Sequence, residues 1–198
     1  MTISYTNTRY YITAILLTIA SLASATTITV DSTDATMGMT SLRTAVANAM
    51  SGDTIVFDAS IDGDTIFLTT EIRLDKNLVI IGNPSTSSGQ AHNTIIDGMG
   101  TSRIFHITAG DTVSISGIKM QGGNGGGSTS PGSGGAILNQ GTLTFTNSTI
   151  SGNTATFGGG VFNTGTSTFT NTAISGNTAN LGGAWTTSPA QRPSSIQP

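Results

Sequence analysis

Two neighbouring segments of the chain repeat each other with a period of 24 residues. Residues 134–157 read GGAILNQGTLTFTNSTISGNTATF and residues 158–181 read GGGVFNTGTSTFTNTAISGNTANL, so they match at 15 of 24 positions without a gap. A third copy begins at Gly182 with GGAW. A fixed period of this length is typical of a solenoid, whose repeats bury their apolar faces against one another. Short alternating apolar runs, separated by Gly and Asn, predict three short strands per coil and an all-β parallel β-helix.

The 24-residue offset also predicts which side chains stack on one another in successive coils. The predicted rows are Phe145 with Phe169, Ile150 with Ile174, Phe157 with Leu181, Asn139 with Asn163, Asn147 with Asn171, and Asn153 with Asn177. Identical amides one strand spacing apart can hydrogen-bond along the axis, so we interpret the asparagines as a structural ladder at the corners. A ligand-binding row is the alternative. Ser167 replaces Leu143 in the second copy, which is expected to weaken the core of that coil.

The repeat is degenerate but traceable upstream. Residues 113–120 resemble residues 143–150 at an offset of 30, and the six extra residues fit the Gly/Ser-rich stretch 122–135. Such a stretch predicts a loop that protrudes from one coil. It lacks the Lys of a phosphate-binding loop and the Asp of calcium-binding repeats, so neither ligand is expected there. Irregular apolar pairs extend the predicted β-helix over residues 53–185.

A different pattern precedes these coils. Leu42, Ala45, Val46 and Ala49 are spaced as one apolar face of a helix. Thr40 or Ser41 is the expected N-cap, and Gly52 is expected to end the helix. A solenoid needs its open end covered, so residues 26–52 are predicted to form a strand and a capping helix. A surface helix without a capping role is the alternative.

Both ends of the chain carry their own signals. Arg9, the apolar run at residues 10–20 and the sequence SLASA at residues 21–25 are typical of a secretory signal peptide over residues 1–25. The alternative, an uncleaved membrane anchor, needs a longer apolar run. No transmembrane helix is expected in the mature chain, which we place outside the cell or at its surface. Residues 186–198 contain three prolines and are expected to be a disordered or truncated tail.

Composition excludes several classes of protein. Gly, Thr, Ser and Asn supply 98 of the 198 residues, whereas charged residues supply 9% and cysteine is absent. Seven basic residues and a net charge of −3 provide no basic surface for nucleic acid or an anionic membrane. The lack of cysteine excludes a disulfide scaffold and thiolate metal sites.

Charged side chains are too sparse after Met120 for acid–base chemistry. Arg192 is the single charged residue from Gln121 to Pro198, and histidine is absent there. A polysaccharide lyase or glycoside hydrolase of the pectin-lyase-like β-helix class, the alternative function, would need carboxylates and a base further upstream. Two upstream groups are weak candidates: Asp58, Asp62 and Asp64 as calcium ligands, and Asp97, Arg103, His106 and Asp111 as catalytic groups. Turn chemistry and surface charge explain both groups better, so no enzyme activity and no cofactor are expected.

The order of the motifs resembles a known family. SLRTAVANA, GDTIVFD, TIIDG, SISGIKMQGGN and the repeated SGNTA are similar to secreted bacterial proteins with a CSLREA-type region and right-handed β-helix repeats of the polymorphic outer-membrane protein (Pmp) type. The resemblance covers most of residues 26–185. Thr40 and Thr44 stand at the family's Cys and Glu positions, and Phe145-Thr146-Asn147 is one residue shorter than the family's FxxN spacing. The resemblance implies a secreted or surface-exposed β-helix, including association with an outer membrane, with adhesion as the usual suggested role.

Together these patterns favour a secreted or cell-surface module that binds or supports other molecules. Outward-facing Thr, Ser and Asn side chains suit a glycan or a protein surface as partner. The threonine rows, Thr142 with Thr166, Thr144 with Thr168 and Thr146 with Thr170, leave ice binding as a remote alternative to simple β-propensity. An uncapped C-terminal coil would expose strand edges, so self-association is also expected.

Overall fold

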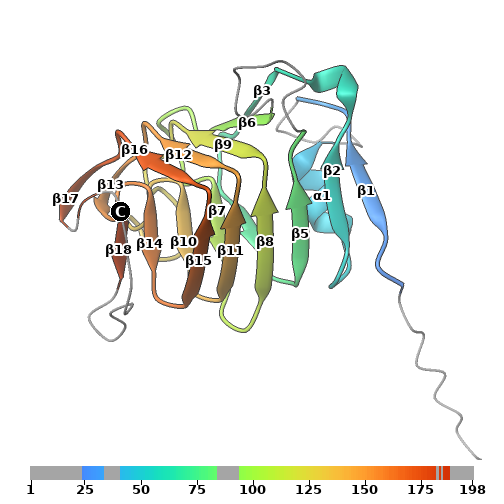
Figure 1. Cartoon of the computed structure of the whole chain (residues 1–198). Helices are drawn as coiled ribbons and strands as arrows, with labels where there is room; N and C mark the ends of the chain where they lie inside the picture. Colours follow the sequence, from blue (N-terminus) through green and yellow to red (C-terminus); the bar gives the residue numbers. More distant parts are fainter. Residues whose placement is uncertain (1–23, 34–40, 84–93, 182, 184, 188–198) are drawn as a thin grey trace, which may run out of the picture.

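The chain folds as a β-solenoid of about five turns, which confirms the predicted all-β parallel β-helix. The computed structural model describes residues 24–33, 41–83, 94–181, 183 and 185–187 (Figure 1). Three parallel sheets run along the solenoid, and each turn contributes one strand to each sheet. The expected signal peptide lies outside the described residues except for its last two positions, and so does Thr40, the alternative N-cap.

The strands of each sheet lie side by side along the solenoid axis in Figure 1. The first sheet contains β1 (Thr27–Val30), β2 (Thr54–Phe57), β5 (Leu78–Ile81), β8 (Thr112–Ser116), β11 (Thr142–Thr146) and β15 (Thr166–Thr170). The second contains β3 (Thr65–Phe67), β6 (Thr94–Asp97), β9 (Ile118–Gln121), β12 (Thr149–Ser151) and β16 (Ala173–Ser175). The third contains β4 (Ile72–Leu74), β7 (Phe105–Ile107), β10 (Ile137–Asn139), β14 (Val161–Asn163) and β18 (Trp185–Thr187).

The register of these sheets is the one that the repeat predicts. Phe145 pairs with Phe169 on one side and with Ile115 on the other, which are the offsets of 24 and 30 residues. The Ile150–Ile174 and Phe157–Leu181 rows are also present. Every second residue of a strand therefore faces the interior, where Val, Ile, Leu and Phe from successive turns form one continuous core.

The last two turns contain a fourth strand that the apolar pattern did not predict. β13 (Thr154–Phe157) and β17 (Thr178–Leu181) pair as a small sheet of their own. Most of their side chains are exposed, so they leave no alternating apolar signature in the sequence. The expectation of three strands per coil is wrong for these two turns.

A single helix in the described part of the chain, α1 (Leu42–Asn48), packs against β1 and β4 at the N-terminal end of the solenoid. Ser41 is its N-cap and accepts a hydrogen bond from the Thr44 amide, as expected. The predicted apolar face is buried. Lys76 donates to the carbonyls of Val46 and Ala49 at the other end of the helix, where a cation offsets the helix dipole.

The expected role of Gly52 is wrong. The helix ends at Asn48, and its C-cap is Ala49, which has an extended backbone. Gly52 lies beyond the helix with a φ of 100°, and its amide donates to the Asn77 carbonyl of the next turn. The glycine is needed for the turn into β2 rather than for the end of the helix.

The C-terminal expectation also needs correction. β18 pairs in parallel with β14 and includes Thr186 and Thr187, so these two residues of the expected tail belong to the third sheet. The rest of that tail, residues 188–198, lies outside the described residues. Within the described ranges, no helix has the length and apolar character needed to cross a membrane.

η1 (Ala59–Ile61) is a single 3₁₀ turn between β2 and β3. It sits at the corner where the first sheet passes into the second. Asp58 begins this turn by accepting a hydrogen bond from the Ser60 amide.

Candidate functional site

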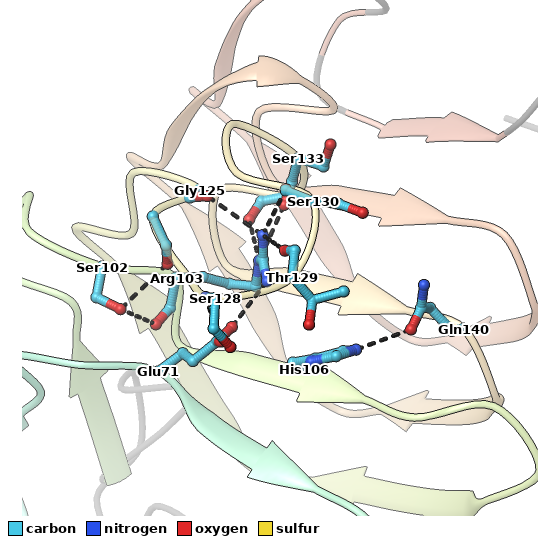
Figure 2. Close-up of polar contacts among 12 residues, drawn as sticks. Glu71, Ser102, Arg103, His106, Gly125, Ser128, Thr129, Ser130, Ser133 and Gln140 are labelled. Atoms are coloured by element: carbon cyan, nitrogen blue, oxygen red, sulfur yellow. Dashed lines mark hydrogen bonds and ion pairs between the residues drawn. The ribbon is translucent and has the colours of Figure 1, made fainter.

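The most unusual side chain in the structure is Arg103, which is completely buried. It precedes β7, and its guanidinium lies under the loop formed by residues 122–135 (Figure 2). Its nitrogens donate to backbone carbonyls of that loop, which are those of Gly125, Thr129, Ser130, Ser133 and Gly134. A planar guanidinium with five N–H donors can satisfy this many acceptors at once, and a lysine cannot.

Glu71 supplies the opposite charge. Its Oε2 lies 2.7 Å from a guanidinium nitrogen of Arg103, and its Oε1 accepts hydrogen bonds from both the amide and the hydroxyl of Ser128. Burial lowers the pKa of Arg103, and the charge of Glu71 opposes that shift. The pair therefore ties the corner before β4, the corner before β7 and the loop into one polar cluster.

The upstream catalytic candidates do not form a catalytic group. Arg103 is committed to Glu71 and the loop, whereas His106 is buried and its Nε2 lies 2.9 Å from Gln140 Oε1 (Figure 2). Asp97 accepts from the Met99 amide and from Gln121, and Asp111 bonds to Thr108. In the described part of the chain, no hydrogen bond or ion pair joins any two of the four residues. The Nδ1 of His106 is buried without a partner there.

Two of the three candidate calcium ligands cap the local backbone, and the third, Asp64, is exposed. Asp58 caps η1, and Asp62 is the C-cap of the same turn. Hydrogen bonds to Ser60 lower the pKa of Asp58, which fits a carboxylate committed to capping. Among the residues that the structure describes, no group of three or more His, Cys, Asp or Glu side chains could hold a metal ion.

The asparagine rows form hydrogen-bonded ladders, and the Asn139–Asn163 row is buried. Asn139 donates to Asn163 Oδ1 at 2.6 Å and Asn153 donates to Asn177 Oδ1 at 2.9 Å, while both also bond to backbone carbonyls. Asn171 donates to Asn147 Oδ1 on the exposed corner. The amides of the first two rows therefore bond within the protein, with Asn153 buried and Asn177 half-buried.

Ser167 joins one of these ladders. Its hydroxyl donates to Asn163 Oδ1 at 2.7 Å and accepts from Asn139 Nδ2 at 3.0 Å. The residue that replaces Leu143 therefore adds a polar link between two turns where an apolar side chain would have packed.

Sequence reasoning predicted an outward-facing row of hydroxyls, and the structure places nine of them together. We call this surface the hydroxyl face; it consists of Thr112, Ser114, Ser116, Thr142, Thr144, Thr146, Thr166, Thr168 and Thr170. They lie on the outer side of β8, β11 and β15 and are exposed or half-buried, whereas the residues between them face the core. Strands about 4.8 Å apart make this a flat, regular surface of hydroxyl and methyl groups.

A second surface feature was not predicted. A pocket of about 400 Å³ lies beside the Arg103 cluster, and we call it the corner pocket. Its lining residues are Thr69, Thr70, Glu71, Thr101, Ser102, Gly126, Gly127 and Ser128. They come from three separate stretches of sequence, and nothing in the local pattern of any one stretch indicates that they meet.

Comparisons of the chain with protein-family models, with curated proteins and with solved structures found no significant match. The function must therefore be argued from the geometry of these surfaces.

Proposed function

We propose that the chain acts outside the cell as a binding or structural module, that it works without catalysis, and that the hydroxyl face is its binding surface. The observation that carries the proposal is the register of that face. Nine Ser and Thr side chains from three adjacent strands form three straight rows on one sheet. Hydroxyls both donate and accept hydrogen bonds, so such a surface suits a glycan or another polar polymer surface.

The resemblance of the sequence motifs to CSLREA-type and Pmp-like proteins supports the same proposal, because adhesion is the suggested role of those relatives. In this proposal the chain is exported by its N-terminal signal and acts as an adhesin-like or structural passenger, secreted or held at the cell surface.

The experiment is a binding screen of the full chain, secreted and purified, against a glycan array and a panel of extracellular-matrix proteins. A double variant, Thr142→Lys with Thr166→Lys, places two charges on paired and exposed positions of the hydroxyl face. The matched control is Thr154→Lys with Thr178→Lys, which are paired and exposed on the small fourth sheet. We expect the first double variant to lose at least tenfold in affinity and the control to retain binding. Equal binding by both variants, or no ligand at all, would contradict the proposal.

We also propose that the chain self-associates through its last turn. In the described residues, β15, β16, β17 and β18 each pair on one side only. Phe169 and Ile174 of this turn are half-buried, whereas their row partners Phe145 and Ile150 are completely buried. Unpaired strand edges beside apolar side chains favour pairing with a second copy. Sedimentation equilibrium of the wild type and of Ile174→Lys tests this, and a concentration-independent monomer for both would refute it.

A further inference from the structure

The corner pocket lies outside the hydroxyl face and is assembled from one corner of three successive turns. Thr69, Thr70 and Glu71 connect β3 to β4, and Thr101 and Ser102 lie between β6 and β7. The 122–135 loop, which connects β9 to β10, supplies Gly126, Gly127 and Ser128. Its volume of about 400 Å³ falls within the range of roughly 300–1,000 Å³ that small-molecule pockets occupy.

Three of the five hydroxyls that line the corner pocket offer acceptors rather than donors. The hydroxyl of Ser102 donates to the carbonyls of Arg103 and Gly126, and that of Thr101 donates to the carbonyl of Gly98. The amide and hydroxyl of Ser128 both donate to Glu71. Each of these three hydroxyls donates its proton to another group of the protein and keeps its oxygen lone pairs. These three positions therefore favour a ligand that brings its own hydrogen-bond donors.

The pocket is also close to electrically neutral. Glu71 is the single titratable residue among those that line it, and its carboxylate is paired with the guanidinium of Arg103 at 2.7 Å. A cationic ligand would have to compete with that buried charge. A neutral ligand with several hydroxyl donors faces no such competition.

The loop side of the pocket is held in one conformation. The five loop carbonyls that accept from Arg103 fix the segment that carries Gly126, Gly127 and Ser128 (Figure 2). A Cβ at Gly127 would collide with the carboxylate of Glu71 and approach Arg103 to 2.9 Å, so the close contact between loop and ion pair requires glycine. A preformed wall reduces the entropy that a ligand must lose on binding.

We propose that the corner pocket binds a neutral sugar residue, whose hydroxyls donate to Glu71, Thr101, Ser102 and Ser128. The site is separate from the hydroxyl face, so it adds a second binding function that neither depends on the first nor supports it. The methyl groups of the threonines and the glycine backbone supply the apolar contacts, and no aromatic ring lines the pocket. We therefore expect a weak affinity, with a Kd of about 1 mM.

The test is saturation-transfer-difference NMR on the full chain with a panel of neutral monosaccharides at millimolar concentration. Hexuronates and hexosamines form the two comparison arms, because they differ from the neutral sugars in charge. Thr70→Trp fills the pocket from an exposed lining position, and Ser128→Ala removes one lining oxygen while the Ser128 amide can still bond to Glu71. Thr154→Trp, at an exposed position of the small fourth sheet, is the matched control, and Thr142→Trp tests the hydroxyl face.

We expect a neutral sugar to bind at least tenfold more tightly to the wild type and to Thr154→Trp than to Thr70→Trp, with Ser128→Ala in between. Loss of binding in Thr142→Trp alone would assign the sugar to the hydroxyl face and overturn the corner pocket while supporting the module proposed above. Preferential binding of the hexuronate or hexosamine, or no binding by the wild type, would also overturn it. Folding of each variant is checked by circular dichroism.

Discussion

Arg103 and Glu71 lie 32 residues apart in sequence, yet a guanidinium nitrogen of one is 2.7 Å from a carboxylate oxygen of the other. The pair joins two adjacent turns and the 122–135 loop, and Arg103 is completely buried while the Glu71 side chain is 11% exposed.

Replacing Arg103 with methionine should destabilise the fold severely. The substitution keeps much of the side-chain volume but leaves Glu71 and five loop carbonyls without their donor. Breaking a buried pair on one side typically costs about 3–5 kcal/mol, which urea unfolding would measure. The control is Arg73→Met on β4, an exposed arginine, for which a change within about 0.5 kcal/mol is expected.

A double variant, measured in the same way, separates the cost of the uncompensated charge from the cost of the unpaired loop carbonyls. Adding Glu71→Leu to Arg103→Met removes the uncompensated charge, so the double variant should recover part of the stability. A double variant that is as unstable as the sum of the single variants would show that the loop carbonyls, and not the ion pair, carry the effect.

The buried and exposed asparagine rows should respond differently to truncation. Asn139→Ala removes the donor to Asn163 and the acceptor of the Gly141 amide, which leaves that buried N–H unpaired. We expect a loss of about 1–3 kcal/mol in the free energy of unfolding.

Asn147→Gly provides the comparison. Asn147 is exposed and has a φ of 48°, a region that glycine enters without strain. We expect Asn147→Gly to change the free energy of unfolding by less than about 0.5 kcal/mol and Asn147→Ala to cost about 1 kcal/mol more. Equal losses in the free energy of unfolding for Asn139→Ala and Asn147→Gly would mean that burial does not set the strength of these ladders.

Alanine should destabilise the fold more at Gly135 than at Gly152, because the first position is crowded and the second is open. At Gly135, a Cβ would collide with the carbonyl oxygen of Gly159 in the next turn, so the coils could not stack at their present distance. Gly152 has a φ of 67° but an open surrounding, so alanine should cost only about 1–2 kcal/mol there. We expect Gly135→Ala to prevent folding or to cost about 3 kcal/mol or more in the free energy of unfolding. Comparable thermal unfolding of the two variants would contradict the stacking argument.

Acid should weaken the N-terminal turn through Asp53. Hydrogen bonds from the amides of Thr26 and Met50, each 2.7 Å long, lower the pKa of this carboxyl in the folded state. Because the folded pKa is below the unfolded one, the stabilisation is complete above the ordinary value of about 3.9 and disappears as the pH falls through the lower, folded value. The protection factors of the Thr26 and Met50 amides against hydrogen exchange, which correct for the intrinsic pH dependence of exchange, should therefore fall below about pH 4.

Asp53→Asn should reduce the melting temperature at pH 7 and flatten its dependence on acid. Asp64→Asn is the control, because that side chain is exposed in the turn before β3. An unchanged acid dependence in Asp53→Asn would show that another carboxyl controls the acid response.

Most of the fold could be predicted from the 24-residue period, because stacking of the turns places identical residues in rows. The Phe145–Phe169 and Asn139–Asn163 rows follow from the 24-residue offset alone. Positions outside that repeat were harder to interpret. Gly52 looked like a helix terminator, but the turn into β2 requires its positive φ.

The corner pocket could not be predicted for a related reason. Glu71 and Ser128 are 57 residues apart and belong to turns of unequal length, so no fixed offset relates them. The isolated charge of Arg103 in a Gly- and Ser-rich region was the one signal available, and it looked like a surface charge. Only the three-dimensional path of the loop shows that its carbonyls close over the guanidinium.

The Asn139–Asn163 ladder has a consequence for how such a chain can change in length. Because 15 of the 24 positions recur unchanged in the next turn, a tandem duplication of residues 134–157 would supply most of the partners that an added turn needs. The solenoid would grow by one strand spacing, about 4.8 Å, and the hydroxyl face would gain one more strand. The length of the solenoid and the area of the hydroxyl face can thus increase together through a single duplication of DNA.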